Sequence, residues 1–385
     1  MKIAFVRKAY DPYGGAERYL SQLMERLWLQ GHEVHVFAHR WESGHPDESR
    51  ADPGGPIFHR VSMIPSPSFL EALSFAWSSR RLLQEQTFDI IHSFERTLYQ
   101  DIYRAGDGCH REWLIQRRKL DPWLKRNTHA LNPLHRTLLY LEKGLFRSSR
   151  LKKIIANSRR GKEEICRHYG VPEEKVEVVH NGVDLEVFHP SNITLYRKSL
   201  RKEFRVPAEA LVILFLGSGF RRKGLKALLE SLPTVKKEMP QVVLMVAGKD
   251  RIQEYREQAR RLGCERNVLF LGPTQRAKEF YATCDLFALP TIYDPFSNAC
   301  LEAMASGIPV LTTPTNGVAE FIEDGKNGFV VQDPLNAAEI GRKVLDFFAS
   351  PDRAGIGERA RKAVLSLDLD SVVRRMLRIY EEIRK

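Results

Sequence analysis

The sequence predicts an α/β protein with two doubly wound parallel sheets, and three observations support this fold class. Short apolar stretches of strand character alternate with helical patterns along nearly all of the 385 residues, which is typical of parallel sheets covered by helices on both faces. The length suits two domains of ordinary size. A turn signal at Asn181-Gly182 divides the alternation. We expect one domain over 1–185, a second over 186–369, and a last helix over 370–385 that packs back across the hinge.

The first half begins with a strand, and the residues after it have helical spacing. Leu20, Leu23 and Leu27 recur at intervals of three or four residues, and Gly31 ends the pattern. Ser158, after the last apolar stretch of this half, is a good N-cap for a further helix. The strands predicted in this half cover residues 3–6, 34–37, 89–92 and 154–156.

The second half repeats this rhythm, and each of its strands is expected to be followed by a helix of about ten residues or more. Parallel sheets of this kind bind ligands beyond the carboxyl ends of their strands. The loops after the strands are therefore where we expect the chemistry of the protein. The strands predicted in this half cover residues 212–216, 242–246, 268–271, 286–289, 309–311 and 328–331.

The composition excludes several classes of protein. Hydrophobic residues make up 43% and charged residues 28% of the chain, which is ordinary for a globular protein and unlike a disordered or fibrous one. The longest apolar runs, such as 211–216, fall far short of the ~20 residues of a membrane span. Residues 1–7 are predicted as a strand and not as a signal peptide. Five scattered cysteines without a CxxC pair argue against a disulfide scaffold or a zinc site and fit a reducing cytoplasm.

Positive charge is concentrated in one segment. The chain has a formal net charge of +12, and residues 111–153 hold twelve basic and three acidic residues. Cations are interleaved there with apolar residues, which suits contact with anionic lipid or with an acidic, phosphorylated acceptor. Two helices with a solvated basic face are the alternative, and no nucleic-acid-binding motif accompanies the charge. The predicted acceptor or membrane surface comprises Arg111, Trp113, Arg117, Arg118, Lys119 and Trp123.

Two glycine-containing loops follow predicted strands. Gly14-Gly15 stands between the first strand and the first helix, as either a plain tight turn or a phosphate or sugar contact at the helix N-terminus. In the second half, Gly217 opens a loop that carries Arg222 and Lys223 ahead of a helix. A guanidinium and an ammonium on flexible backbone match a diphosphate, although two solvated cations give the same pattern.

Two carboxylates stand eight residues apart in Asp294-Pro-Phe-Ser-Asn-Ala-Cys-Leu-Glu302. The proline predicts that a helix begins at Ser297 or Asn298, which places Asp294 in the loop and Glu302 one turn inside the helix. Both acids then reach one ligand at the helix N-terminus, where carboxylates accept hydrogen bonds from sugar hydroxyls and helix amides hold a phosphate. The alternative for either acid is a helix cap or a surface position.

Residues from both halves combine into a wider pattern. They are Gly14-Gly15, Ser158, Asn181-Gly182-Val183-Asp184, Phe188, Pro190, Arg222-Lys223-Gly224, the two spaced acids, Ala303 and Gly307-Ile-Pro-Val310. This pattern resembles family 4 of the retaining glycosyltransferases, which have the GT-B fold of two Rossmann-like domains facing each other across a cleft. The resemblance implies a nucleotide sugar on the second domain, an acceptor on the first, and no metal or cofactor.

A narrower resemblance comes from residues 10–18, Trp41-Glu42, residues 101–109 and residues 217–220. These segments are similar to the lipopolysaccharide core glucosyltransferase I group, which transfers glucose from UDP-glucose to an inner-core heptose. The resemblance implies Asp107 and Asp294 as catalytic residues, with His110 as a substitute for Asp107. Most members have glutamate at the position of Asp294, which leaves the donor sugar open. The implied donor-binding residues are Gly14, Gly15, Gly217, Arg222, Lys223, Phe296, Ser297, Asn298 and Glu302.

The expected partners are a nucleotide sugar, a glycan or glycolipid acceptor and an anionic membrane surface, without specific nucleic acid. The expected location is the inner face of the cytoplasmic membrane, as a peripheral protein. Two other functions stay open: a nucleotide-sugar 2-epimerase on the same fold, and a non-catalytic basic protein that binds lipid or nucleic acid. Turnover of a nucleotide sugar without an acceptor indicates the first, and lack of specific nucleotide-sugar binding indicates the second.

Overall fold

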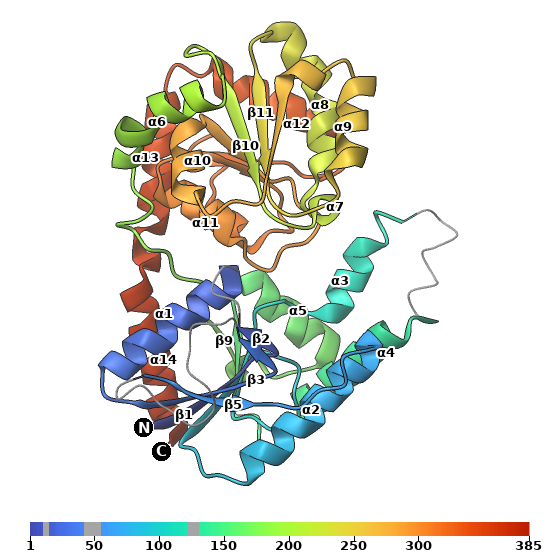
Figure 1. Cartoon of the computed structure of the whole chain (residues 1–385), viewed down its shortest axis with the longest axis vertical. Helices are drawn as coiled ribbons and strands as arrows, with labels where there is room; N and C mark the ends of the chain where they lie inside the picture. Colours follow the sequence, from blue (N-terminus) through green and yellow to red (C-terminus); the bar gives the residue numbers. More distant parts are fainter. Residues whose placement is uncertain (11–14, 42–54, 122–130, 385) are drawn as a thin grey trace. The chain divides into compact units, whose positions relative to one another are not determined.

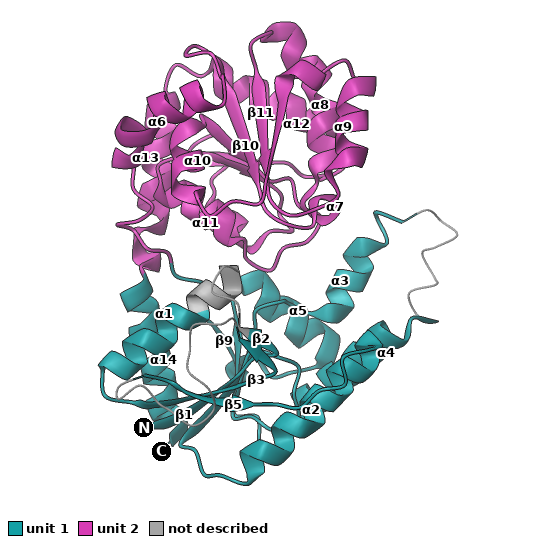
Figure 2. Ribbon diagram, viewed as in Figure 1, with its two compact units in different colours: residues 1–182, 369–385 teal, residues 183–368 magenta. Residues whose placement is uncertain are grey.

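The computed structural model describes residues 1–10, 15–41, 55–121 and 131–384 and divides the chain into two compact units (Figure 2). Unit 1 consists of Met1–Gly182 and Leu369–Lys385, and unit 2 of Val183–Asp368. Within the described residues, each unit is built on one large parallel sheet, with seven strands in unit 1 and six in unit 2. The predicted fold class is confirmed.

The sheet of unit 1 has the strand order β5-β3-β1-β6-β7-β8-β9, so the direction in which strands are added reverses between β1 and β6. The sequence patterns predict four of these strands and miss β5, β7 and β9. A separate pair joins β2 (Ala9–Tyr10) to β4 (Arg40–Trp41). The strands of the large sheet are β1 (Lys2–Val6), β3 (Glu33–Ala38), β5 (Ile57–Arg60), β6 (Ile90–Ser93), β7 (Ile102–Ala105), β8 (Lys153–Ala156) and β9 (Val176–Val178).

Helices cover both faces of this sheet (Figure 1). Because side chains alternate along a strand, Ile3 and Phe5 of β1 pack among side chains of α1 and α14, whereas Ala4 and Val6 pack with side chains of α2. The last helix, α14, lies against α1 and contributes to the core of unit 1. The helices of unit 1 are α1 (Gly15–Leu29), α2 (Ser68–Gln84), α3 (His110–Arg117), α4 (Pro133–Arg147), α5 (Arg159–Tyr169), the 3₁₀ turn η3 (Glu173–Lys175) and α14 (Leu369–Arg384).

The sheet of unit 2 has the order β12-β11-β10-β13-β14-β15, and its direction of growth reverses between β10 and β13. All of its neighbouring strands are parallel. The strands are β10 (Val212–Leu216), β11 (Val243–Ala247), β12 (Val268–Gly272), β13 (Leu286–Ala288), β14 (Val310–Thr312) and β15 (Gly328–Val330). Their predicted counterparts differ from these bounds by a residue or two at most.

The helices of unit 2 are shorter in places than the sequence predicts. The expected long helix is wrong after β14, which leads into a five-residue 3₁₀ helix, and too long after β12 and β13, which lead into helices of seven and eight residues. After β13 and β14, the residues that were expected to be helical form loops, and these loops carry residues of the candidate site. The elements are α6 (Ser191–Glu203), α7 (Phe220–Lys223), α8 (Leu225–Glu238), α9 (Ile252–Arg261), η4 (Glu265–Asn267), α10 (Ala277–Thr283), α11 (Asn298–Ala305), η5 (Gly317–Phe321), α12 (Ala337–Ala349), α13 (Arg353–Val364) and η6 (Leu365–Leu367).

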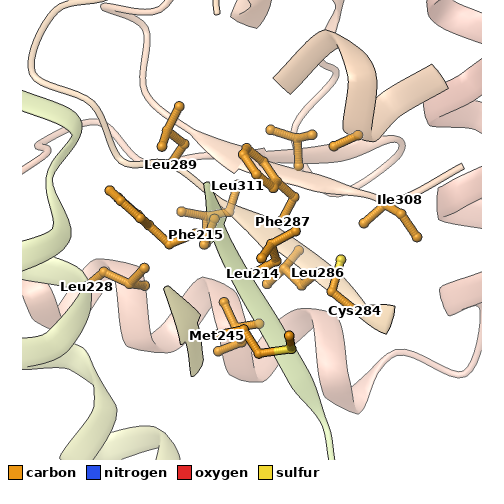
Figure 3. Close-up of a cluster of buried hydrophobic side chains, with 14 of the residues drawn as sticks. Leu214, Phe215, Leu228, Met245, Cys284, Leu286, Phe287, Leu289, Ile308 and Leu311 are labelled. Atoms are coloured by element: carbon orange, nitrogen blue, oxygen red, sulfur yellow. The ribbon is translucent and has the colours of Figure 1, made fainter. Parts of the chain in front are cut away.

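The core of unit 2 is formed by strands that are buried on both faces. Figure 3 shows side chains of β10, β11, β13 and β14 packed together, with Phe215 and Phe287 among them. Both of these phenylalanine side chains are fully buried. This packing fixes the carboxyl ends of β10 and β13, from which the loops of the site begin.

Candidate active site

The strand-order reversal of unit 2 gathers most of the predicted donor residues. Strand β10 is followed by α7, and β13 is followed by the segment that contains Asp294. Strand β14 is followed by the segment Thr313-Pro-Thr-Asn316. The carboxyl ends of strands on either side of such a reversal are the usual ligand site of a doubly wound sheet. The structure therefore brings Arg222, Lys223 and Asp294 to the edge where a ligand is expected.

Glycines bracket α7 and let it turn tightly. Gly219 precedes the helix at φ 75° and Gly224 follows it at φ 83°, both in the left-handed region that favours glycine. A Cβ at Gly224 would lie 2.0 Å from the carbonyl oxygen of Pro290. The close approach of these two backbone segments sets α7 against the loop that follows β13.

The surroundings of Arg222 and Lys223 differ from the open loop that their sequence predicts. Both stand in a four-residue helix, and Lys223 is only 8% exposed. The expectation of an open loop is wrong because α7 packs on the segment after β13: the carbonyl of Arg222 accepts hydrogen bonds from the amide of Ile292 at 2.9 Å and the hydroxyl of Thr291 at 3.1 Å. These cations are held in place and are not solvated ends of a flexible loop.

Three charged side chains form one cluster at this point. The Lys223 Nζ lies 2.5 Å from Oδ2 of Asp294, and the Arg222 Nη1 lies 3.5 Å from the same oxygen. The Arg222 Nη1 also donates to the carbonyl of Tyr293 at 2.8 Å. Burial raises the pKa of the Asp294 carboxyl, but the two cations and a backbone N–H from Phe296 outweigh burial and lower the pKa. Asp294 is therefore ionised at neutral pH and holds both cations at one spot.

Backbone contacts fix the loop that carries Asp294. Its amide donates to the carbonyl of Thr315 at 3.0 Å, and its own carbonyl accepts from the amide of Gly317 at 3.0 Å. Asn316, which is 1% exposed, accepts from the amides of Ser297 and Val318 at 3.2 Å each. Sequence reasoning missed Asn316, although the turn-forming Asn316-Gly317 pair after a predicted strand was an available signal.

The predicted helix that carries Glu302 is confirmed as α11. Ser297 caps it by accepting a hydrogen bond from the amide of Cys300 at 3.4 Å. One oxygen of Glu302 accepts from the hydroxyl of Tyr281 at 3.0 Å. Sequence reasoning missed Tyr281, which comes from α10 and has no pattern that links it to Glu302. The side chain of Phe296 is buried and its ring packs against Phe321, and its backbone N–H donates to the carboxylate of Asp294.

In unit 1, Asp107 lies just beyond the carboxyl end of β7. Its side chain is 59% exposed, and its Oδ2 lies 3.8 Å from Nη1 of Arg96. Arg96 is held in turn by Glu142, whose Oε1 accepts from the guanidinium Nε at 2.8 Å. Asp107 is thus an accessible carboxylate beside an anchored cation.

The alternative residue, His110, has different surroundings. It is buried, and its Nε2 lies 3.2 Å from Nδ1 of His135. Burial, with the charge of Arg96 beside it, lowers the pKa of His110 to about 3. His110 is thus a buried, neutral imidazole beside a second one, and Asp107 is the more accessible of the two side chains.

The remaining predicted residues lie in unit 1. Gly14 and Trp123 fall outside the described residues, and Gly15 is the first residue of α1. On and after α3, Arg111, Arg118 and Lys119 are exposed and Trp113 is half-buried. Arg117 is also half-buried. Its Nε lies 3.7 Å from Oδ2 of Asp121, and its Nη1 lies 3.2 Å from Nε2 of His135.

Two family descriptions match the chain, one in each half. Residues 13–187 match the family described as Glycosyltransferase Family 4, and residues 197–363 match the family described as Glycosyl transferases group 1. The chain belongs to glycosyltransferase family 4. It is an enzyme of that family, which uses a nucleotide sugar.

Two similar proteins align with nearly the whole chain or with part of it. The lipopolysaccharide glucosyltransferase WaaG of Escherichia coli K12 is 25% identical over 380 residues, which are 97% of this chain and 96% of that protein. A D-inositol 3-phosphate glycosyltransferase of Corynebacterium kroppenstedtii is 31% identical over 246 residues, which are 60% of this chain and 54% of that protein.

Solved structures of similar proteins show the same fold. A crystal structure of WaaG matches with a TM-score of 0.84 at 24% identity. The match covers 98% of this chain and 99% of the WaaG chain. Anabaena HepE in complex with UDP and glucose matches with a TM-score of 0.73 at 21% identity over 99% of both chains. The family 4 chain described here therefore has the GT-B fold.

Proposed function

We propose that this family 4 enzyme is a retaining hexosyltransferase that moves glucose from UDP-glucose to a lipopolysaccharide core or a similar glycan or glycolipid acceptor. The observation that carries the proposal is the cluster of Arg222, Lys223 and Asp294 at the strand-order reversal of unit 2. The similarity to WaaG, which is named a lipopolysaccharide glucosyltransferase, supports the sugar and the acceptor class. The HepE structures that contain UDP or UDP-glucose support the donor.

The chemistry follows from the charge that develops on the leaving group. When the bond between the anomeric carbon and the phosphate oxygen breaks, the diphosphate gains negative charge, and Arg222 and Lys223 stabilise it without having to move. The acceptor hydroxyl forms the new bond on the same face of the anomeric carbon, and its proton passes to the departing phosphate oxygen. We assign Asp107 to orienting the acceptor hydroxyl and Glu302, positioned by Tyr281, to the ribose.

The two carboxylates of the donor site are expected to separate binding from transfer. Glu302→Gln should weaken UDP binding roughly tenfold, because it removes a charged partner of the ribose hydroxyls. Asp294→Asn should spare UDP binding, because Arg222 and Lys223 remain, while transfer falls at least ~tenfold, because this carboxylate is assigned to the donor sugar. Calorimetric titration with UDP and turnover assays measure both effects. Equal weakening of UDP binding in the two variants contradicts this division of roles.

No metal ion is assigned to the proposed site. Across the ranges that the structure describes, no group of three or more His, Cys, Asp or Glu side chains is arranged to hold one. Arg222 and Lys223 supply the positive charge that a divalent cation supplies elsewhere. Turnover is therefore expected to stay unchanged in excess chelator, measured against the same assay with added magnesium. Activity that requires magnesium or manganese would overturn this part of the proposal.

The proposed location is peripheral, at the inner face of the cytoplasmic membrane. No helix in the described parts of the chain is long and apolar enough to span a bilayer. The exposed cations Arg111, Arg118 and Lys119, on and after α3, support contact with anionic lipid or with a phosphorylated acceptor.

A further inference from the structure

A buried carboxylate on α4 collects hydrogen bonds from three other parts of unit 1. Glu142 is 0% exposed. Its Oε1 accepts from Nε of Arg96, in the loop between β6 and β7, at 2.8 Å, and from the backbone N–H of His110, at the start of α3, at 2.7 Å. Its Oε2 accepts from the hydroxyl of Tyr169, at the end of α5, at 2.5 Å. Donors on both oxygens fix the position of this carboxylate.

The contact between Arg96 and Glu142 is a buried ion pair, since their side chains are only 10% and 0% exposed. The guanidinium of Arg96 keeps its charge at any ordinary pH. Burial raises the pKa of Tyr169, and the charge and hydrogen bond of Glu142 raise it further. The phenol therefore keeps its proton at neutral pH and donates it to the carboxylate. Loss of charge at Glu142 leaves the guanidinium without the partner that anchors it.

The other end of the Arg96 guanidinium reaches the turn after β7 that carries Asp107. Its Nη2 donates to the carbonyl of Gly108 at 3.1 Å, and its Nη1 lies 3.8 Å from Oδ2 of Asp107. The planar fork thus works in two directions, because Nε binds the buried carboxylate while both terminal nitrogens face the turn. Arg96 connects the fully buried Glu142 to the exposed carboxylate of Asp107.

Neighbouring segments hold the backbone of this turn. Gly108 has a φ of 71°, in the left-handed region, and its carbonyl accepts from Arg96. The carbonyl of Gly106 accepts from Nδ2 of Asn157, which follows β8, at 3.1 Å. Hydrogen bonds on both sides of Asp107 therefore set the direction in which its side chain, 59% exposed, leaves the turn.

We propose that Glu142 is a positioning residue for the transfer step and that it acts through Arg96 to hold Asp107 where the acceptor hydroxyl is oriented. The proposal rests on the function proposed above, which assigns Asp107 to that hydroxyl. Because a displacement of about 1 Å at a reacting group costs up to ~10²-fold in rate, a carboxylate that cannot contact the substrate controls turnover. An ion pair that only stabilises the fold is the alternative.

Glu142→Gln tests this proposal, because glutamine has nearly the same shape but no charge to anchor the guanidinium. The assay follows transfer from UDP-glucose to a deacylated lipopolysaccharide core that ends in heptose, at a temperature where the variants are folded. We expect kcat/KM for this acceptor to fall at least ~tenfold. The Kd for UDP, from calorimetric titration, should stay that of the parent, because the assigned donor residues are in unit 2. A parental kcat/KM overturns the proposal.

A double-mutant cycle with Asp107→Ala shows whether Glu142 acts through that carboxylate. Glu142→Gln should lower kcat/KM in the parent but add less than ~twofold in the Asp107→Ala background, because the group that it positions is already missing. Losses that multiply contradict the proposal. A parental kcat/KM in Asp107→Ala alone would instead overturn the proposed role of Asp107, so the two failures are distinguishable.

The matched control is Glu112→Gln on α3. Glu112 is also buried, but its Oε2 lies 2.7 Å from Nε2 of His168 and 3.1 Å from Nη2 of Arg167, both on α5. Both glutamine variants should lower the unfolding midpoint, because each weakens a buried ion pair. Only Glu142→Gln should lower kcat/KM, and an equal loss in Glu112→Gln overturns the proposal.

A second variant covers the case in which Glu142→Gln does not fold. Arg96→Met combined with Glu142→Gln removes both charges together, so no buried charge is left without a partner. This double variant should fold, bind UDP like the parent and still lose at least ~tenfold in kcat/KM for the acceptor. Parental kcat/KM in the double variant would show that the Arg96–Glu142 pair does not position Asp107.

Discussion

Replacing Lys223 by alanine is expected to lower turnover by at least ~tenfold, and removal of one preorganised charge donor costs up to ~10³-fold in well-studied sites. The ammonium lies 2.5 Å from Asp294 and is nearly buried, so water replaces it poorly when charge develops on the diphosphate. Arg222→Ala should also lose at least ~tenfold. Steady-state kinetics with a saturating acceptor measure both effects.

The Lys223→Ala substitution is also expected to lower the free energy of unfolding of unit 2. Lys223 and Asp294 expose only 10% and 9% of their side chains, and breaking a buried ion pair on one side costs ~3–5 kcal/mol because the remaining charge loses its partner. Arg222, 3.5 Å from Asp294, compensates part of that charge, so the lower end of this range is expected. Denaturant unfolding measures the loss.

A double variant separates the two effects. Lys223→Met combined with Asp294→Asn removes both buried charges and should recover most of the stability of the parent, while turnover stays low because the cation is still missing. Full recovery of turnover in the double variant would mean that Lys223 serves only to neutralise Asp294. Parental kinetics in both Lys223→Ala and Arg222→Ala would remove the diphosphate assignment altogether.

The strands that are apolar throughout are the ones that the sequence predicts best. The run at 212–216 coincides with β10 because a central parallel strand is buried on both faces and must be apolar at every position. Strand β7 was not predicted because it is not apolar throughout: it contains Arg104. That guanidinium is 2% exposed and donates to Oδ1 of Asn181 at 2.6 Å. A buried charge whose partner is 77 residues away has no local sequence signature.

The same contrast holds at the candidate site. Arg222, Lys223 and Asp294 are predictable as a group, because each follows a recognisable strand and parallel strands end at one edge. The burial of Lys223 is not predictable, because it depends on how closely α7 approaches the loop after β13. The Asn316-Gly317 pair marks a turn in the sequence, but the contacts of Asn316 with Ser297 and of Tyr281 with Glu302 are created only by the fold.

Gly224→Ala is expected to displace the loop after β13 and to lower both stability and turnover. The new Cβ would lie 2.0 Å from the carbonyl oxygen of Pro290, and the backbone φ of 83° is strained for alanine. Because a backbone oxygen cannot rotate away as a side chain does, the loop after β13 must move. Strain at a left-handed position costs ~1–3 kcal/mol, and the displacement adds to that cost.

Gly219→Ala is the matched control, because it separates strain from displacement. Its φ of 75° is nearly the same, but a Cβ there meets nothing within 4 Å, so only the strain of ~1–3 kcal/mol is expected, without displacement of the loop. In Gly224→Ala, the shift also pulls Ile292 from the carbonyl of Arg222 and Asp294 from Lys223. Unfolding midpoints should therefore fall further, and turnover at a temperature where both variants are folded should fall in Gly224→Ala alone. Equal losses in the two variants would show that the contact with Pro290 does not hold the cluster in place.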